Sequence, residues 1–343
     1  MTAPQSNSAY DRSRRLLADL NLASVALIWG INMPIMKFAL GRMDDEYLFN
    51  AVRLTFSAIT LGALLAWKYR KKTTSINGAE ADAGDGARPT GEDAGPPRRL
   101  RIPIWRRYSR RQWVSILSFS FLAGFAYQVC FLLGIDGTTA GNTALIMSAI
   151  PMWTAILAFL MIGERLKRGA WAGLWIALAG VLIVTFSKPS SNIVIQGSLV
   201  GNLIVSLAAF SWAFASVLSR PLMKTVSPLE LAFYSVALTV PFHFLIAGPA
   251  VAEIGQLFDD PWLMLAIVYS GVFSTGLAYA MWNFGVQQLG ASHAAGFQNL
   301  VPLVALAASW LLIGEVPFPA QVIGGVVIIS GLWTMRNQRQ KTS

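Results

Sequence analysis

Charged residues are scarce in this chain. Only 13% of its 343 residues are charged, whereas 55% are hydrophobic. A soluble domain is about one quarter charged, because charged side chains cover the surface that faces water. The composition therefore excludes an ordinary soluble protein. Apolar stretches of about 20 residues, the length that a helix needs to cross a bilayer, recur along the whole chain and indicate an all-α integral membrane protein.

Residues suited to redox, metal or acid–base chemistry are also few. Cys130 is the one cysteine, which excludes an internal disulfide and a multi-cysteine metal site. The two histidines are far apart in the sequence. None of the 17 acidic residues falls near the middle of a predicted span, where a proton-coupled pump commonly keeps one. We therefore predict no catalytic residue, no metal site, no cofactor and no enzymatic activity.

Ten apolar segments are long enough to be transmembrane helices. They are about twice as long as a barrel strand and lack its alternation. Several carry a tryptophan near one end, where amphipathic rings favour the membrane interface. The predicted spans are Leu20–Leu40, Leu48–Trp67, Trp113–Leu133, Gly141–Ile162, Ala170–Phe186, Leu199–Leu218, Leu229–Ala247, Trp262–Phe284, His293–Ile313 and Val322–Met335.

The lysines and arginines predict the orientation. If the N-terminus is cytoplasmic, nearly all of the 27 basic residues fall on the cytoplasmic side, and only Arg42 and Lys188 fall in exterior loops. Cytoplasmic loops of membrane proteins carry such an excess of Lys and Arg. The sequence therefore predicts a multi-pass protein of the cytoplasmic (inner) cell membrane with both tails, residues 1–19 and 336–343, inside the cell.

The second half of the chain repeats the first. Residues 20–187 and 197–335 each hold five predicted spans, and matching positions late in the halves are 151 residues apart. Because five is odd, the two five-helix repeats must be inverted relative to each other, as in many secondary transporters. The matching pairs are Pro151 and Pro302, Gly163 and Gly314, Glu164 and Glu315, Gly173 and Gly324, and Gly180 and Gly331.

One long polar segment, Lys68–Arg111, is an insertion that the second half lacks. Its ends are basic, and its middle, Asn77–Gly95, is rich in Gly, Ala, Asp and Glu, a composition that cannot bury enough apolar area to fold. We expect a disordered cytoplasmic loop whose basic ends contact anionic lipid headgroups. The net charge of +10 gathers beside apolar stretches, so we predict membrane lipids as partners and not nucleic acid.

Polar and aromatic side chains within the spans are the candidate substrate-binding residues. They occur in predicted spans 1, 3, 4, 6, 8 and 9, and must point inward because lipid offers no hydrogen-bond partner. Each one either lines a common cavity or makes a helix–helix hydrogen bond, and their recurrence favours the cavity. The candidates are Trp29, Asn32, Tyr127, Gln128, Asn142, Ser148, Trp212, Ser216, Tyr279, Trp282, Asn283, Gln298 and Asn299.

Two prolines and two glutamates are the candidate gating residues. Pro151 and Pro302 fall about ten residues into spans 4 and 9, where a proline removes a hydrogen bond and kinks the helix. Glu164 and Glu315 end the same spans. Because the halves are inverted, we expect Glu164 to face the cytoplasm and Glu315 the exterior. Each glutamate either pairs with a local donor at its helix end or makes a gate contact.

Two basic residues lie within predicted spans. Lys37 is about 5 Å along the helix from the end of span 1, and Arg53 about 8 Å from the start of span 2, at a rise of 1.5 Å per residue. A basic residue at mid-bilayer is costly. We therefore expect both side chains to reach the outer interface. The alternative is that one of them neutralises a carboxylate or phosphate of a substrate.

The order and duplication of these motifs resemble those of the EamA-type drug/metabolite transporters. The resemblance lies in Trp29-Gly30-x-Asn32, Arg53, the two Pro…Gly-Glu pairs and the glycines of spans 5 and 10. It covers nearly the whole chain except the N-terminal tail and Lys68–Arg111. It implies a ten-helix inverted-repeat carrier with a central cavity lined by spans 1, 3, 4, 6, 8 and 9, often one that exports amino acids or other small metabolites.

Together these observations predict a secondary transporter that moves a small-molecule substrate by alternating access. The aromatic and amide side chains favour a neutral or zwitterionic solute such as an amino acid, with export as the expected direction. Two alternatives stay open. One is an exporter of amphiphilic drugs or nucleotide-type metabolites. The other is a membrane scaffold or lipid-handling protein that transports nothing.

Overall fold

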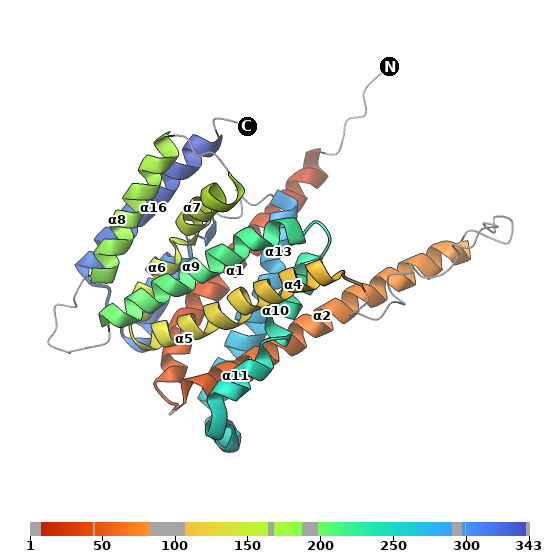
Figure 1. The fold of residues 1–343 in the computed structure, drawn as a ribbon, viewed down its shortest axis with the longest axis horizontal. Coiled ribbons are helices and arrows are strands. Elements are labelled where there is room, and N and C mark those ends of the chain that lie inside the picture. The colour runs from red at the N-terminus through yellow and green to blue at the C-terminus, as the bar shows by residue number, and fades with distance from the viewer. Residues whose placement is uncertain are drawn as a thin grey trace.

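The computed structural model describes residues 8–43, 45–82, 107–163, 168–186, 198–289, 297–298 and 300–340, and every element in these residues is helical (Figure 1). The elements of the first half are α1 (Ser8–Leu40), α2 (Glu46–Asp82), α4 (Arg110–Phe119), η2 (Ser120–Ala126), α5 (Tyr127–Asp136), α6 (Ala140–Met147), α7 (Ile150–Ile162) and α8 (Arg168–Phe186). Those of the second half are α9 (Ser198–Leu222), α10 (Pro228–Ala237), α11 (Val240–Ala247), η3 (Gly248–Phe258), α12 (Pro261–Val268), η4 (Tyr269–Leu277), α13 (Ala278–Leu289), α15 (Leu300–Ile313) and α16 (Pro319–Gln340).

Eight helical runs of the described residues are long and apolar enough to cross a membrane, and they overlap the first eight predicted spans. Two shorter apolar helices, Leu300–Ile313 and Pro319–Thr334, lie where the ninth and tenth spans were predicted. The prediction of an all-helical, multi-pass membrane protein is confirmed. Ten crossings and the N-in/C-in orientation stay predictions.

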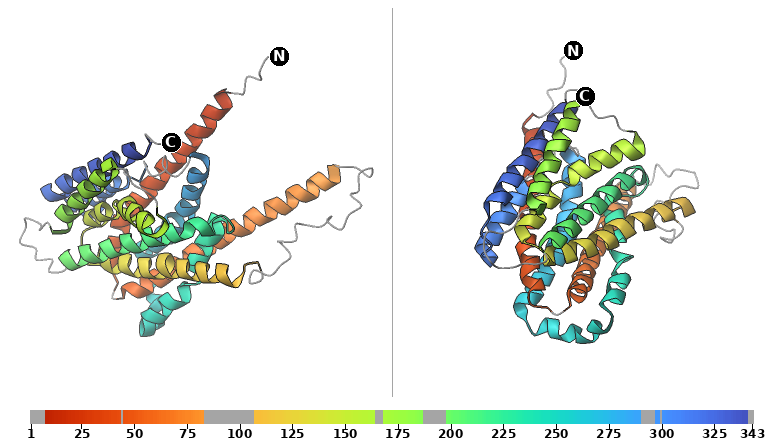
Figure 2. Two further views of the ribbon diagram at one scale, coloured as in Figure 1. Left: turned by 45° about the horizontal axis from the view of Figure 1, so that its top comes forward. Right: turned by 60° about the vertical axis from the view of Figure 1, so that its left-hand side comes forward.

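The two halves are interleaved. α1 packs against α13 and α15, α5 and α7 pack against α9, and α2 packs against α10, α11 and η4. Each of these contacts joins a helix of the first half to one of the second. Because α1 and α2 cross the second half, the centre of the molecule is built by both halves. The N-terminal end of α1 and the C-terminal end of α2 project from this bundle (Figure 2).

α8 and α16 pair with each other at one side of the bundle (Figure 1). Glycines allow their backbones to approach closely. A Cβ added to Gly331 would lie 2.4 Å from the Ala177 nitrogen, and one added to Gly180 would lie 2.6 Å from the Ile328 nitrogen. The matched glycines of spans 5 and 10 therefore lie where the two repeats contact each other.

Helix ends repeat as well. Gly163 ends α7 with a φ of 66°, and Gly314 follows α15 with a φ of 70°. A left-handed residue after the last turn is a common way to end a helix, and glycine adopts it without strain. The matched Gly-Glu motifs of the sequence thus both begin with a glycine of positive φ. Glu164 lies outside the described residues.

The third and eighth spans each contain a π-helix in the middle, η2 and η4, which the sequence did not predict. Carbonyls of these segments accept hydrogen bonds from side chains of other helices. The Gly124 carbonyl accepts from Thr239 at 3.1 Å, and the Gly271 carbonyl accepts from Ser57 at 2.9 Å. π-Helical turns are frequent at functional sites, and these two occupy matching places in the two halves.

The fourth span is broken and not merely kinked. α6 ends at Met147, a turn at Ser148 and Ala149 follows, and α7 starts at Ile150. Pro151 is therefore in the first turn of α7. N–H groups of a first turn have no acceptor within the helix, so a proline there removes no helical hydrogen bond. Pro302 is in α15 after Leu300 and Val301, and residue 299, just before them, lies outside the described residues. The prediction that these prolines kink the interior of a continuous helix was wrong for Pro151.

The non-helical part of the polar insertion is shorter than predicted. α2 continues to Asp82, within the segment Lys68–Arg111 that we expected to be a disordered loop. No proline occurs before Pro89, so nothing in this stretch forbids helical backbone. Residues 83–106 lie outside the described part of the chain, and contact between the loop and lipid stays a prediction.

Candidate functional site

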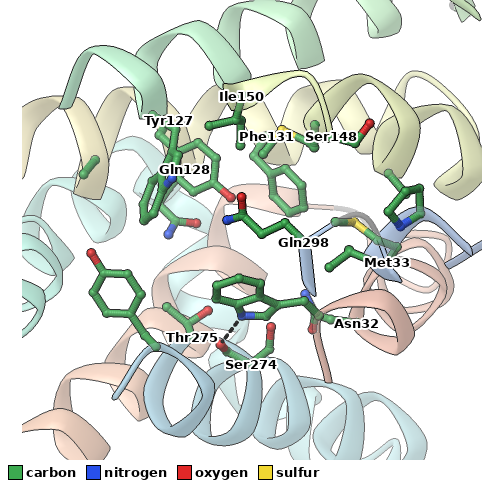
Figure 3. A pocket seen from close by; sticks show the side chains of 18 of the residues that line it. Asn32, Met33, Tyr127, Gln128, Phe131, Ser148, Ile150, Ser274, Thr275 and Gln298 are labelled. Carbon is green, nitrogen blue, oxygen red and sulfur yellow. Dashed lines mark hydrogen bonds between the residues drawn. The ribbon is translucent and has the colours of Figure 1, made fainter. Parts of the chain in front are cut away.

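A cavity of about 150 Å³ lies at the centre of the bundle, between the two halves (Figure 3). Its walls come from α1, α2, η2, α5 and the α6–α7 break of the first half, and from α9, α10, η4, α13 and α15 of the second. The lining residues are Trp29, Asn32, Met33, Arg53, Ala123, Tyr127, Gln128, Phe131, Ala144, Met147, Ser148, Ile150, Trp212, Ser235, Val236, Ser274, Thr275, Tyr279, Gln298, Val301 and Pro302.

The structure brings most of the predicted binding residues together around this cavity. They come from all six of the spans that the sequence singled out. Those that line the cavity are Trp29, Asn32, Tyr127, Gln128, Ser148, Trp212, Tyr279 and Gln298, together with the predicted gating residue Pro302. Their role in binding a substrate stays a prediction.

Three predicted binding residues are not among the described residues that line it. The Asn142 side chain is buried in a separate network, described below, and the Ser216 hydroxyl donates to the Trp212 carbonyl of its own helix at 2.8 Å. Trp282 packs against Trp29, with ring centroids 5.5 Å apart. The side chains of Asn283 and Asn299 lie outside the described residues.

One wall of the cavity is aromatic. The ring of Trp212 lies between those of Tyr127 and Tyr279, with centroid separations of 4.8 and 5.8 Å. Trp29 also lines the cavity, and its Nε1–H donates to the carbonyl of Ser274, which is labelled in Figure 3, at 3.0 Å. Such a surface can take an apolar group or, through the faces of its rings, a cation.

Arg53 borders the cavity and does not reach the outer interface as predicted. It is 2% exposed, and its guanidinium donates to the oxygens of four neutral side chains. The distances are 2.6 Å to Asn50 Oδ1, 2.7 Å to Gln128 Oε1, 3.2 Å to Thr275 Oγ1 and 3.3 Å to Ser270 Oγ. The prediction failed because the Arg53 side chain is buried inside the bundle. The oxygens of these four side chains take the place of water there.

A chain of polar contacts holds this guanidinium in place. Asn50 Oδ1 accepts from both Arg53 Nη2 and Arg53 Nε, so the Asn50 amide nitrogen must point the other way, to His243 Nδ1 at 3.2 Å. His243 Nε2 lies 2.9 Å from the Gly124 carbonyl, which can only accept. Both contacts fit a neutral histidine that carries its proton on Nε2. His243 therefore supports Arg53 through Asn50.

A second polar cluster, the α5–α6 corner, contains Lys37 and Glu315, which bond to the backbone where α5 ends and α6 starts. Glu315 Oε2 accepts from the Ala140 N–H at 3.0 Å, at the start of α6. Burial raises the pKa of the Glu315 carboxyl. Lys37 Nζ donates to the Ile135 carbonyl at 3.0 Å and to the Asp136 carbonyl, at the end of α5. Lys37 thus donates to carbonyls at the end of α5, and its reach to the outer interface stays a prediction.

Asn142 belongs to this corner. Its Nδ2 donates to Thr138 and to Asn202, at 3.3 and 3.2 Å, and its Oδ1 accepts from Gln321 at 2.9 Å. Gln321 also donates to Thr139 at 3.1 Å. Every polar atom of the Asn142 side chain therefore has a partner within the protein.

Several lining residues were not predicted from the sequence. Ser274 and Thr275 lie within predicted span 8 and border the cavity, and their hydroxyls were a signal of the same kind as the amides that were chosen. Ser235 is similar, in predicted span 7. Met33 and Phe131 carry no such signal, because apolar residues of a span face either lipid or protein.

Comparisons with known proteins agree with this architecture. The model of the EamA-like transporter family matches residues 100–186 and 199–336. The chain is 29% identical over 226 residues to the uncharacterized transporter YyaM of Bacillus subtilis (strain 168), covering 66% of this chain and 73% of that protein. It is 28% identical over 224 residues to a probable amino-acid metabolite efflux pump of Escherichia coli (strain K12), covering 63% and 73%.

A solved structure shares the fold, with a TM-score of 0.56 and 17% sequence identity over 94% of this chain and 98% of that one. The names of family and relatives indicate a transporter of small molecules and not an enzyme. The multi-pass helical bundle, the cavity between its halves and the family match on both halves lead to one identification: the chain belongs to the EamA-like transporter family.

Proposed function

We propose that the protein is a secondary transporter that exports a small metabolite, an amino acid or a related zwitterionic or neutral solute, across the cytoplasmic membrane by alternating access. The observation that carries this proposal is the cavity that the two repeated halves build together. A relative named as a probable amino-acid metabolite efflux pump supports the choice of substrate and direction.

The elements around the cavity suit a site that opens to one side at a time. The break between α6 and α7, the π-helix η2 and the π-helix η4 all lie beside it. Irregular helices at membrane depth are tolerated where they line a cavity, and they let one helix segment move relative to the next. The α5–α6 corner would then close one side while the other is open.

Proteoliposomes that contain the purified full-length protein test this proposal. We expect saturable counterflow of at least one labelled amino acid, inhibited by the same unlabelled solute. Replacing the central aromatic ring, Trp212→Ala, should lower the flux roughly tenfold. The matched control is Trp310→Ala, because Trp310 is exposed on α15 and does not line the cavity.

The substrate panel decides between this proposal and its alternatives. Flux of amphiphilic cations or nucleotides in place of amino acids would identify a drug or nucleotide-metabolite exporter. No saturable flux of any amino acid, nucleoside, organic acid or amphiphilic cation would overturn the transporter proposal. In that case deleting residues 77–95 would test the scaffold alternative, which predicts loss of a bound partner or of lipid association.

A further inference from the structure

We propose that Arg53 binds a carboxylate of the transported solute, so that the substrate is a carboxylic acid with one negative charge, free or zwitterionic. This inference rests on the transporter function proposed above and names the chemistry of its substrate. Four observations carry it: the burial of Arg53, the absence of a counter-ion among the described residues, the free donors beside it and the charge of the cavity.

The charge of Arg53 has no protein partner in the described residues. The guanidinium is 2% exposed, and the side chains that accept its hydrogen bonds are all neutral. Ion pairs of the described chain with N···O distances up to 4.0 Å occur elsewhere, at Arg42–Asp260 and Arg107–Glu230. A buried cation without a counter-ion is costly, because neutral dipoles replace hydration only in part. An anion that enters the cavity would remove this cost.

The hydrogen bonds of Arg53 also prepare two donors for such an anion. The guanidinium can only donate, so Gln128 must present Oε1 to it, and the Gln128 amide N–H groups point elsewhere. The Thr275 hydroxyl accepts from Arg53 and keeps its own proton free to donate. Gln128 and Thr275 both border the cavity (Figure 3). Neither donor has an acceptor in the described part of the chain, so a carboxylate can receive both, with the Arg53 charge directly behind.

The charge of the cavity limits the charge of the ligand. Arg53 is the one charged side chain among the described residues that line it. One cation matches a carboxylate, whereas a phosphate ester would bring a second negative charge with nothing to oppose it. An α-ammonium group of the solute would lie against the faces of the aromatic wall, such as those of Tyr127 and Trp212. The arrangement therefore favours acids and amino acids over phosphates and simple amines.

The position of the guanidinium is fixed before any solute arrives. Asn50 accepts two of its N–H groups, and Asn50 is itself held by His243, which bonds to the Gly124 carbonyl of η2. Gly124 packs so closely that an added Cβ would lie 1.7 Å from the Ser235 carbonyl oxygen. A rigid site loses little freedom on binding, which favours affinity and selectivity.

Binding to matched pairs of solutes tests the inference. The probes are phenylalanine and leucine, their amino alcohols phenylalaninol and leucinol, the amine phenethylamine and an aromatic phosphate ester, phenyl phosphate. Calorimetry or ligand-induced thermal shift on the full-length protein in detergent gives the affinities. We expect the amino acids to bind about 10- to 100-fold more tightly than their amino alcohols, the range for a charged hydrogen bond.

Variants at the site connect this preference to Arg53. Arg53→Gln should remove the preference for the acid while the amino alcohol still binds, and Arg53→Lys should restore part of it. Because Arg53→Gln changes a buried network, Gln128→Glu is the second variant. It places a carboxylate beside the guanidinium, so it should fold and block amino-acid binding. Gly255→Ala is the neutral control, because an added Cβ there meets nothing within 4 Å.

Each outcome has one consequence. Equal binding of amino acid and amino alcohol by the wild-type protein, tighter binding of phenyl phosphate, or an unchanged preference for the acid in folded Gln128→Glu protein would overturn the inference while leaving the transporter function intact. Absence of saturable transport of any solute in the proteoliposomes would overturn the proposed function and, with it, this inference.

Discussion

The indole Nε1–H of Trp29 donates to the carbonyl oxygen of Ser274 at 3.0 Å. Trp29 is on α1 of the first half and Ser274 is in the π-helix η4 of the second, and both border the central cavity. The bond therefore joins the halves at the wall of the site. Any motion that separates α1 from η4 must break it.

Removing this bond should alter transport more than folding. Trp29→Phe keeps an aromatic ring beside Trp282 and loses the N–H donor. We expect a stability loss of about 1 kcal/mol, the net value of a typical hydrogen bond, and a changed rate of transport measured in proteoliposomes. Trp333→Phe on α16 is the control, because Trp333 is 64% exposed. Identical transport rates in Trp29→Phe and wild type would show that the bond is not broken during the cycle.

Removing the Asn142 side chain should lower stability and leave the preference among solutes unchanged. Asn142→Ala removes one hydrogen bond each from Thr138, Asn202 and Gln321, which keep their other partners. The net loss of a hydrogen bond costs about 1 kcal/mol, so the variant should unfold at a lower temperature while its order of preference among solutes is unchanged. Thermal unfolding in detergent and a competition assay measure the two. A changed preference with unchanged unfolding would instead place Asn142 in the binding site.

Asn142 and Gln128 show why the sequence predicted the site only in part. Both are amides within predicted spans, and both must point away from lipid. Gln128 borders the cavity, whereas Asn142 is enclosed by its network. The rule that buried amides need partners selects both, but which partner each one meets depends on how α1, α9 and α16 cross. No local sequence pattern determines how these helices cross.

The fold was more predictable than the site for a physical reason. Eight spans follow from length and hydrophobicity, which lipid imposes on every residue of a segment. The π-helices η2 and η4 depend instead on side chains from other helices, such as Ser57 and Thr239, that bond to their carbonyls. Arg53 was misplaced for the same reason, since four partners, two of them on η4, hold it inside.

The contact between α8 and α16 predicts a strong effect of one methyl group. In Gly331→Ala the added Cβ would lie 2.4 Å from the Ala177 nitrogen and 2.7 Å from the Gly173 carbonyl oxygen. Because backbone atoms cannot rotate away, the helices must separate, at a cost of about 1–3 kcal/mol. Gly255→Ala, which meets nothing within 4 Å, is the control. Equal unfolding temperatures for the two variants would contradict close packing of α8 on α16.

The Glu315 carboxyl predicts a pH dependence of stability. Burial raises its pKa above the usual value, even though the N–H of Ala140 and the charge of Lys37 act in the other direction. The folded protein therefore holds this proton more tightly than the unfolded chain does. The contribution of Glu315 to stability is fully present below the ordinary glutamate pKa of about 4.3, and it is lost as the pH rises through the raised pKa of the folded state.

Glu315→Gln removes this titration. Relative to wild type, the variant should gain stability as the pH is raised from about 4 to 8, because only the wild type must bury a charge at the higher pH. Unfolding temperatures in detergent across this range measure the difference. Glu253→Gln, which removes one exposed carboxylate on η3, is the control for the loss of a negative charge. A difference that changes in the opposite direction with pH would mean that the start of α6 and Lys37 stabilise the carboxylate more than burial destabilises it.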